Sequence, residues 1–410
     1  MWKIAWRNLW RNRTRTLIIA SAIAFSYGLM LISMGVNADS YAKMETLAQE
    51  AVGGSVLVHA RGWWESQGSD RVLEDPRPLV EEAGALEGVE EAIPRVIIQG
   101  LLSSARGNEA VRLSGVVPER EVALNDVRED LVAGAFFDPE LEAPLVLSQG
   151  LAEKLNLELG DKAVLTASMR NGEVTRALFW VSGLTKTGAA GEAELQAYTT
   201  LAAAQQALQM GDALTQIGVV ARDSAAQAMI VEALRARVDP QAVEVLNWQD
   251  AIPELSGLLE FDAAVNWIYF AVIFLIVLFA IANTFLMAVM ERVREYGLLS
   301  ALGVGPRSVG WLVVWEAFFL ALVGLAVGFV IGISGHLTIA YIGIDMAALG
   351  AGDIEMAGVG MSELVVRSHL EPGRWLVATL MVLAVVMISA VYPAVRAMRL
   401  APSQAMRFYE

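Results

Sequence analysis

The residue types that most often carry chemistry in proteins are few in this sequence, and they stand apart from one another. The 410-residue chain has no cysteine, which excludes disulfides and thiolate metal sites. Its histidines, His59, His336 and His369, lack the paired spacing of metal ligands. There is no Gly-x4-Gly-Lys-Ser/Thr phosphate loop, and "GISGH" lacks the final glycine of a Gly-x-Ser-x-Gly nucleophile motif. We therefore predict no catalytic residue, no metal site and no cofactor bound by this chain itself.

A compact group of charges lies in "ERVREYGLLSALGVGPRS", Glu291–Ser308, between two of the most apolar runs of the chain. The pattern predicts a helix over Glu291–Leu302, which Gly303 ends in a left-handed conformation and after which Pro306 begins the next helix. The ion pairs that a spacing of three allows are Glu291–Arg294 and Arg292–Glu295. A short helix held tightly at both ends cannot be pushed without moving both apolar runs. We predict that it is a docking element for a protein that moves.

The apolar runs that hold this helix indicate a membrane protein. The sequence is 55% hydrophobic and only 18% charged, and four runs are long enough to cross a bilayer, which takes about 20 residues. We read the first run as a retained span because its apolar core is too long for a signal peptide. The predicted order is an interfacial helix at 1–16, spans at 17–36, 263–290, 308–344 and 375–395, an outer α/β domain at 37–262, the docking helix and turn at 291–307, an outer loop at 345–374 and a tail at 396–410.

The charges give these spans one orientation. Residues 37–262 carry 17 Lys and Arg against 36 Asp and Glu, and residues 345–374 carry two Arg against five acids. The other connecting and terminal segments are basic, and basic residues gather on the cytoplasmic side of short loops. We predict that both termini and the docking helix are cytoplasmic. The acidic outer domain argues against a nucleic-acid partner.

The N-terminal segment "MWKIAWRNLWRNRTRT" has tryptophan at positions 2, 6 and 10, each followed by a basic residue. This spacing places the tryptophans on one stripe of a helix, as expected for a helix lying on an anionic inner leaflet. Glu316, near the start of the third span, needs a partner. We predict that the cationic N-terminal helix, within residues 7–15, supplies it.

Two further features concern packing and the outer domain. Gly324, Gly328 and Gly332 recur every four residues and predict a helix-packing face in the third span. The outer domain is predicted to mix α and β and to be large enough for two subdomains. Its expected strands are Ser55–Ala60, Arg95–Leu101, Val111–Val117, Lys162–Ala167 and Leu178–Val181, and its expected helices are Gln149–Leu155, Leu201–Met210 and Ser224–Val238, the last within a strand–helix–strand unit.

The whole layout resembles the FtsX/MacB-like (type VII) superfamily of ABC transporter permeases. The resemblance rests on one N-terminal span, a large outer domain, three C-terminal spans, "ERVREYGLLSALG", the closing "YPAVRAMRLAPSQAMRF" and, in the outer domain, "LVLSQGLAEKLNLELGD". Size and layout are most similar to the lipoprotein-releasing permeases of the LolC and LolE type. The resemblance implies a bacterial inner-membrane protein with a MacB-like periplasmic core domain.

The resemblance also implies partners and sites. A separate ATPase, present as a homodimer and binding ATP and Mg²⁺, would grip the coupling helix of each of two permease chains, identical or paralogous. The coupling residues would be Glu291, Arg292, Arg294, Glu295, Gly297, Leu298, Ala301, Leu302 and Gly303. For a lipoprotein or other amphiphilic substrate, the acyl chains would enter a cavity for which bulk and depth suggest Phe25, Leu29, Trp267, Phe270 and Phe274. Two alternatives stay open: MacB-like efflux of a peptide or antibiotic with an adaptor, and FtsX-like signalling to a cell-wall hydrolase.

Overall fold

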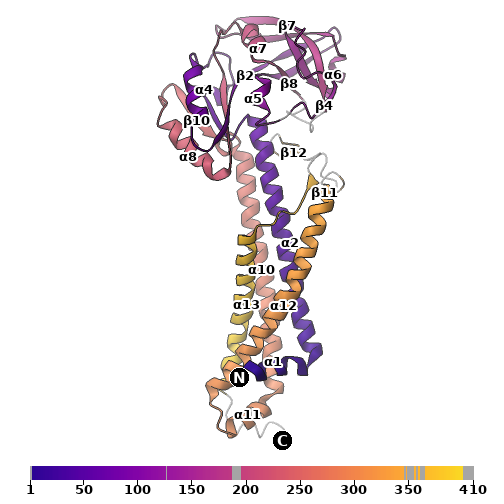
Figure 1. Ribbon diagram of the computed structural model, residues 1–410, viewed down its shortest axis with the longest axis vertical. Coiled ribbons are helices and arrows are strands. Elements are labelled where there is room, and N and C mark those ends of the chain that lie inside the picture. Colours follow the sequence, from indigo (N-terminus) through magenta and orange to yellow (C-terminus); the bar gives the residue numbers. More distant parts are fainter. Residues whose placement is uncertain are drawn as a thin grey trace. The chain divides into compact units, whose positions relative to one another are not determined.

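The computed structural model describes residues 2–125, 127–186, 195–345, 348, 355–356, 359–360 and 365–399 (Figure 1). The chain divides into two compact units. A helical unit comprises Met1–Ala42, Glu260–Ile344 and Val365–Glu410, and an α/β unit comprises Lys43–Leu259 and Asp345–Leu364. Two of the four boundaries fall inside long helices, so each of these helices contributes residues to both units.

The helical unit is built on four helices that are long and apolar enough to cross a membrane. They are α2 (Arg13–Val52), α10 (Pro253–Glu291), α12 (Pro306–Ile342) and α13 (Pro372–Met398), accompanied by the short helices α1 (Trp2–Arg11) and α11 (Val293–Ala301). The predicted membrane fold with four spans is therefore confirmed. Helices α2, α10 and α13 extend beyond the predicted spans at both ends because polar but helix-forming residues continue the apolar runs. Helix α2, for example, continues until Gly53 and Gly54, which both have positive φ. Helix α12 begins two residues earlier than predicted and ends two residues earlier, before Gly343.

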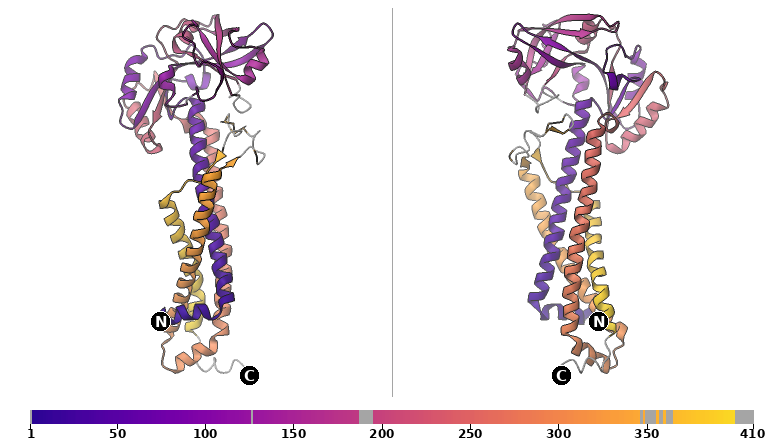
Figure 2. Two further views of the ribbon diagram at one scale, coloured as in Figure 1. Left: turned by 45° about the vertical axis from the view of Figure 1, so that its right-hand side comes forward. Right: turned by 180° about the vertical axis from the view of Figure 1, so that it is seen from behind.

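The N-terminal segment forms a ten-residue helix, which is shorter than the predicted 1–16. Asn12 lies outside α1 and α2, and its carbonyl accepts a hydrogen bond from the backbone N–H of Thr16 at 3.2 Å. The Thr16 hydroxyl donates to the carbonyl of Leu9 at 2.5 Å. These local bonds satisfy backbone groups that a helix end leaves free, so the chain turns here from α1 into α2. In Figures 1 and 2, α1 lies across the long helices at the end of the helical unit that carries α11.

The α/β unit contains a ten-stranded sheet in the order β10-β1-β9-β2-β3-β8-β5-β7-β4, with β6 paired to β2 and β7. The strands are β1 (Val56–Ala60), β2 (Val89–Ser103), β3 (Asn108–Val116), β4 (Leu131–Gly134), β5 (Pro144–Ser148), β6 (Lys162–Ser168), β7 (Val174–Thr185), β8 (Gln196–Thr200), β9 (Gln216–Ala221) and β10 (Val243–Asn247). The helices are α3 (Trp63–Ser66), α4 (Pro76–Gly84), α5 (Pro118–Glu121), α6 (Gln149–Leu155), α7 (Leu201–Leu208), α8 (Ser224–Arg235) and α9 (Trp248–Ala251). Short strands β11 (Ile344–Asp345), β12 (Glu355–Met356), β13 (Val359–Gly360) and β14 (Val365–Val366) occur between α12 and α13.

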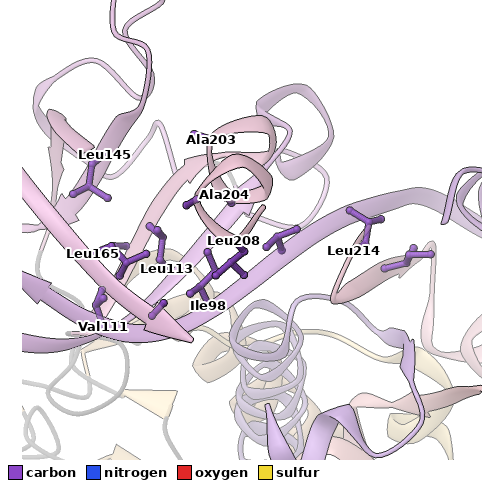
Figure 3. Packing of buried hydrophobic residues seen from close by; sticks show 14 of the residues in the cluster. Ile98, Val111, Leu113, Leu145, Leu165, Ala203, Ala204, Leu208 and Leu214 are labelled. Atoms are coloured by element: carbon purple, nitrogen blue, oxygen red, sulfur yellow. The ribbon is translucent and has the colours of Figure 1, made fainter. Parts of the chain in front are cut away.

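Strand β2 joins two groups of strands. Its first half pairs with β9, and its second half pairs with both β3 and β6. The pairing β2-β3-β8-β5-β7-β6-β2 returns to its start and forms a closed ring, while β9, α8 and β10 form the predicted strand–helix–strand unit, with β1 between the two strands. One hydrophobic cluster runs through both groups (Figure 3). The expected two subdomains thus share a strand and a core, and they form one compact unit.

The expected strands and helices of this unit all occur; α6 has the predicted bounds, and the others differ at one or both ends. The largest difference is at β2, which begins at Val89 although the prediction began at Arg95. The residue types in this part of the strand do not predict a strand, because it contains Glu90, Glu91 and Pro94, and charged residues and proline are rare in strand interiors. In the structure Glu90 points outward, whereas Ala92 and Ile93 are buried.

Candidate functional site

The connection between α10 and α12 folds as a separate short helix. Helix α10 ends at Glu291, Arg292 is a turn residue, and α11 runs over Val293–Ala301. The helix therefore begins two residues later than predicted. Its end follows the prediction, since Gly303 has φ of 89° and Pro306 opens α12 behind the extended residue Gly305. A glycine at this φ avoids the steric cost that a side chain would incur.

Helix α11 has one buried face and one exposed face. Val293, Tyr296 and Gly297 are buried, and Val293 and Tyr296 are 4% and 2% exposed. The predicted coupling residue Gly297 is itself buried and therefore lies on the packed side of the helix. This corrects the expectation that Gly297 is available for docking.

The exposed face of α11 is apolar for most of its length. Leu298 is 57% exposed and Leu302, just beyond the helix, is 78% exposed; Arg294 and Ala301 are exposed as well. These four residues follow a helical spacing of four, three and one, so they form one stripe, which we call the docking stripe. Leu298 and Leu302 are four residues apart, so their apolar side chains are neighbours on this stripe.

A set of charge pairs fixes α11 to its neighbours, with Glu316 on α12 at its centre. Glu316 is 6% exposed, and its Oε1 accepts hydrogen bonds from Arg292 and from Asn8 Nδ2, both at 2.8 Å. The prediction that a cation of the N-terminal helix pairs with Glu316 is therefore wrong. Helix α1 supplies a neutral amide, and the cation comes from Arg292, which the break between α10 and α11 turns toward α12.

Two further acids complete this set. The predicted Arg292–Glu295 pair is present, with Arg292 Nε donating to Glu295 Oε2 at 2.9 Å, and Glu295 also accepts from Arg11 on α1. Burial acts to raise the pKa of Glu295, but the hydrogen bonds from Arg11 and Arg292 outweigh it and lower the pKa. Glu291 Oε2 lies 3.5 Å from Arg15 Nη1 on α2. The predicted partner of Glu291 was Arg294.

The glycine stripe of α12 faces α2 within the helical unit. A Cβ built on Gly328 would lie 2.6 Å from the carbonyl oxygen of Ala24, and one on Gly324 would lie 2.7 Å from Ile23. On Gly332 it would meet the Leu31 side chain at 2.7 Å. These distances are below van der Waals contact, so only glycine allows the two helices this approach.

The five predicted cavity residues divide between two environments. Phe25, Leu29 and Trp267 are 65%, 44% and 55% exposed. Phe270 is buried and Phe274 is partly buried, and both pack into the hydrophobic cluster of the helical unit. The structure therefore places Phe270 and Phe274 in a packing role within this chain and leaves the other three side chains on its surface.

Sequence reasoning missed how the ends of α2 and α10 are fixed within the α/β unit. Gln216 on β9 is fully buried, and its Nε2 donates to the carbonyl of Val52, the last residue of α2, at 2.8 Å. A hydrophobic cluster joins this end of α2 to α9 and to the start of α10; its buried members are Met44, Ala48, Val52, Leu57, Trp248, Ala251 and Leu255. The Gly53–Gly54 pair was the only sequence signal for the end of α2.

A buried ion pair lies beside this helix end. Arg95 on β2 and Glu121 on α5 have side chains that are 4% and 2% exposed, and Arg95 donates to both carboxylate oxygens. A Cβ on Gly53 would collide with the Arg95 guanidinium. Across the part of the chain that the structure describes, no group of three or more His, Asp or Glu is arranged to hold a metal.

Two protein families match this chain. The FtsX-like permease C-terminal family matches residues 267–402, and the MacB-like periplasmic core domain family matches residues 16–237. The first match contains α11, α12 and α13, together with most of α10. The second contains most of α2 and the α/β unit as far as the residues after α8.

Individual relatives cover most of the chain. The lipoprotein-releasing system transmembrane protein LolC of Neisseria meningitidis is 25% identical, over 83% of this chain and 83% of that protein. The corresponding LolE of Haemophilus influenzae is 23% identical, over 98% of this chain and 97% of that protein. Among solved structures, the periplasmic region of MacB from Actinobacillus actinomycetemcomitans matches 47% of this chain and 88% of its own, at 14% identity and a TM-score of 0.34.

Proposed function

The chain belongs to the ABC transporter permeases that have a MacB-like periplasmic core domain and an FtsX-like C-terminal region, and we propose that it extracts a lipoprotein or another amphiphilic substrate from the outer face of the bacterial inner membrane. A separate ATPase subunit, acting as a homodimer, binds ATP and Mg²⁺ and supplies the energy. Two permease chains, identical or paralogous, complete the complex. Both termini and α11 face the cytoplasm, and the α/β unit lies in the periplasm.

The observation that carries this proposal is the docking stripe on α11. A helix whose outer face is Arg294, Leu298, Ala301 and Leu302 and whose inner face is packed offers an apolar surface on a fixed support. Burying one leucine side chain at an interface contributes about 1.5–3 kcal/mol. The ATPase covers this stripe, so a change in the ATPase dimer moves α11 directly.

Movement of α11 reaches the α/β unit through covalent and packed connections. Helix α11 follows α10 after one turn residue, and the outer end of α10 packs against the outer end of α2 in a single hydrophobic cluster. The bond from Gln216 to Val52 holds the last turn of α2 to the sheet. A helix is stiff along its axis, so a displacement at one end of α2 or α10 is transmitted to these contacts.

The substrate class is proposed from the relatives and from the exposed residues of the helical unit. Relatives that cover most of the chain are named for lipoprotein release, and Phe25, Leu29 and Trp267 present bulky apolar side chains. Such a surface suits acyl chains, since each buried CH₂ contributes about 0.8 kcal/mol.

Reconstitution tests this proposal. The permease and its ATPase are placed in proteoliposomes with an acylated protein, and the same protein without its acyl chains is the matched control. ATP should release the acylated form into solution and leave the control unaffected. A complex that hydrolyses ATP, releases no acylated protein and instead activates a bound cell-wall hydrolase would establish the signalling function. Export of a peptide or antibiotic that requires an adaptor would establish efflux.

A further inference from the structure

Helix α1 has two chemically different faces, and they connect different parts of the molecule. Its inner face packs through Ala5 and Leu9, which are 0% and 7% exposed, into the hydrophobic cluster of the helical unit. Asn8, beside this face, is bonded to Glu316, and Arg11, which continues the stripe of Lys3 and Arg7, pairs with Glu295. Helix α1 thus contacts the residues that position α11.

The outer face of α1 is aromatic and basic. Trp2, Trp6 and Trp10 are 55%, 42% and 42% exposed, and Lys3 and Arg7 are exposed between them. Neither Lys3 nor Arg7 has an acidic partner among the residues that the structure describes. Tryptophan rings beside unpaired cations complement a surface with an apolar interior and anionic headgroups.

From these two faces we infer that α1 is a sensor of anionic lipid that sets the position of the coupling helix α11. Anionic headgroups bind Lys3 and Arg7 while the tryptophans enter the headgroup region, and this holds α1 flat against the membrane. Asn8 then stays bonded to Glu316, whose second partner is Arg292 at the start of α11. Lipid composition at the inner leaflet is therefore transmitted to α11 through two carboxylates, Glu316 and Glu295, which bind Asn8 and Arg11 of α1.

The relay has few steps, which makes its residues specific. Glu316 Oε1 accepts hydrogen bonds from Asn8 and from Arg292, both at 2.8 Å. If Asn8 is displaced, Arg292 is the only described donor to that carboxylate. Arg292 in turn bonds Glu295, which also binds Arg11. Displacing α1 therefore removes two of the bonds that order α11, the one to Glu316 and the one to Glu295. The consequence for transport rests on the proposed function, whereas the lipid dependence of α11 does not.

Hydrogen exchange of the full-length chain without any ATPase tests this inference. The chain is placed in nanodiscs of neutral lipid, or of neutral lipid with about one third phosphatidylglycerol, and exchange of the α11 amides is measured. Anionic lipid should slow that exchange by up to about 25-fold, because each of the two cations near an anionic surface contributes about fivefold to binding. The Lys3→Gln/Arg7→Gln variant should lose this difference. Arg307→Gln, which removes an exposed charge of the same sign at the start of α12, should keep it.

A second variant separates lipid binding from the relay. The Asn8→Leu/Glu295→Ala variant removes both bonds between α1 and these carboxylates and leaves the outer face of α1 intact. Exchange of α1 itself should still slow in anionic lipid while α11 no longer responds. The inference is overturned if wild-type α11 exchanges equally in both lipids, if Arg307→Gln abolishes the response, or if α11 still responds in Asn8→Leu/Glu295→Ala. Because no nucleotide or partner is present, a failure of the proposed transport function would leave these results unchanged.

Discussion

Replacing Gly328 with alanine should destabilise the helical unit, although alanine is the better helix former. The new Cβ would lie 2.6 Å from the carbonyl oxygen and 2.9 Å from the Cα of Ala24. Both are backbone atoms, which cannot move aside without shifting α2. Overpacking of this kind costs up to about 3 kcal/mol, and the gain in helix propensity returns about 1 kcal/mol. We expect a net loss of about 2 kcal/mol.

The matched control is Gly257→Ala on α10, where no atom lies within 4 Å of the added Cβ. This variant gains the same propensity without a collision, so its stability should rise by up to about 1 kcal/mol. Gly332→Ala should lie between the two, because its Cβ meets atoms of the Leu31 side chain and no backbone atom among its three nearest contacts.

Unfolding in detergent, followed by tryptophan fluorescence, measures these differences without thiol dyes, which a chain lacking cysteine cannot bind. The midpoints should follow the order Gly257→Ala, wild type, Gly332→Ala, Gly328→Ala. Equal midpoints for Gly257→Ala and Gly328→Ala would refute the close approach of α2 and α12.

Three other predictions concern the α/β unit and the topology. Burial lowers the pKa of His59 despite the nearby Glu244, so the unfolded state binds the proton more readily. The free energy of unfolding should fall as the pH drops below about 6.5, by at most about 1.4 kcal/mol per pH unit. A His59→Phe variant titrated by denaturant should lack this contribution. Glu121→Gln should cost about 3–5 kcal/mol because it leaves the buried Arg95 without a counter-charge, and the Arg95→Met/Glu121→Gln double variant should be more stable than Glu121→Gln in the same titration. A cysteine at Val174, 67% exposed, should react with an impermeant maleimide from the periplasmic side, and one at Leu302 only after the membrane is opened; the reverse pattern would overturn the orientation.

Local signals predicted the parts of the fold that depend on neighbours in sequence. Runs of apolar residues predicted the four long helices, and Gly303 and Pro306 predicted where α11 ends and α12 begins. These features follow from hydropathy and from backbone preferences of single residues. The spacing of Gly324, Gly328 and Gly332 likewise predicted a packing face, although it could not identify α2 as the partner.

Features that depend on side-chain direction were harder to predict. The break at Arg292 contains no glycine or proline, so no local pattern indicated that this side chain turns toward Glu316. The same break rotates Gly297 to the packed side of α11. The bond from Gln216 to Val52 joins residues more than 160 positions apart, and no local pattern specifies such a contact.

The claim that the ATPase binds α11 is tested most directly by equilibrium binding. The ATPase that co-purifies with the wild-type chain is titrated against Leu298→Asp, Leu302→Asp and the control Leu258→Asp, which alters a leucine of α10 that is 45% exposed. Losing the burial of one leucine and placing a charge in the interface should weaken binding at least a hundredfold for the two α11 variants. The control should bind like the wild type. Equal affinity for all three variants would contradict the account.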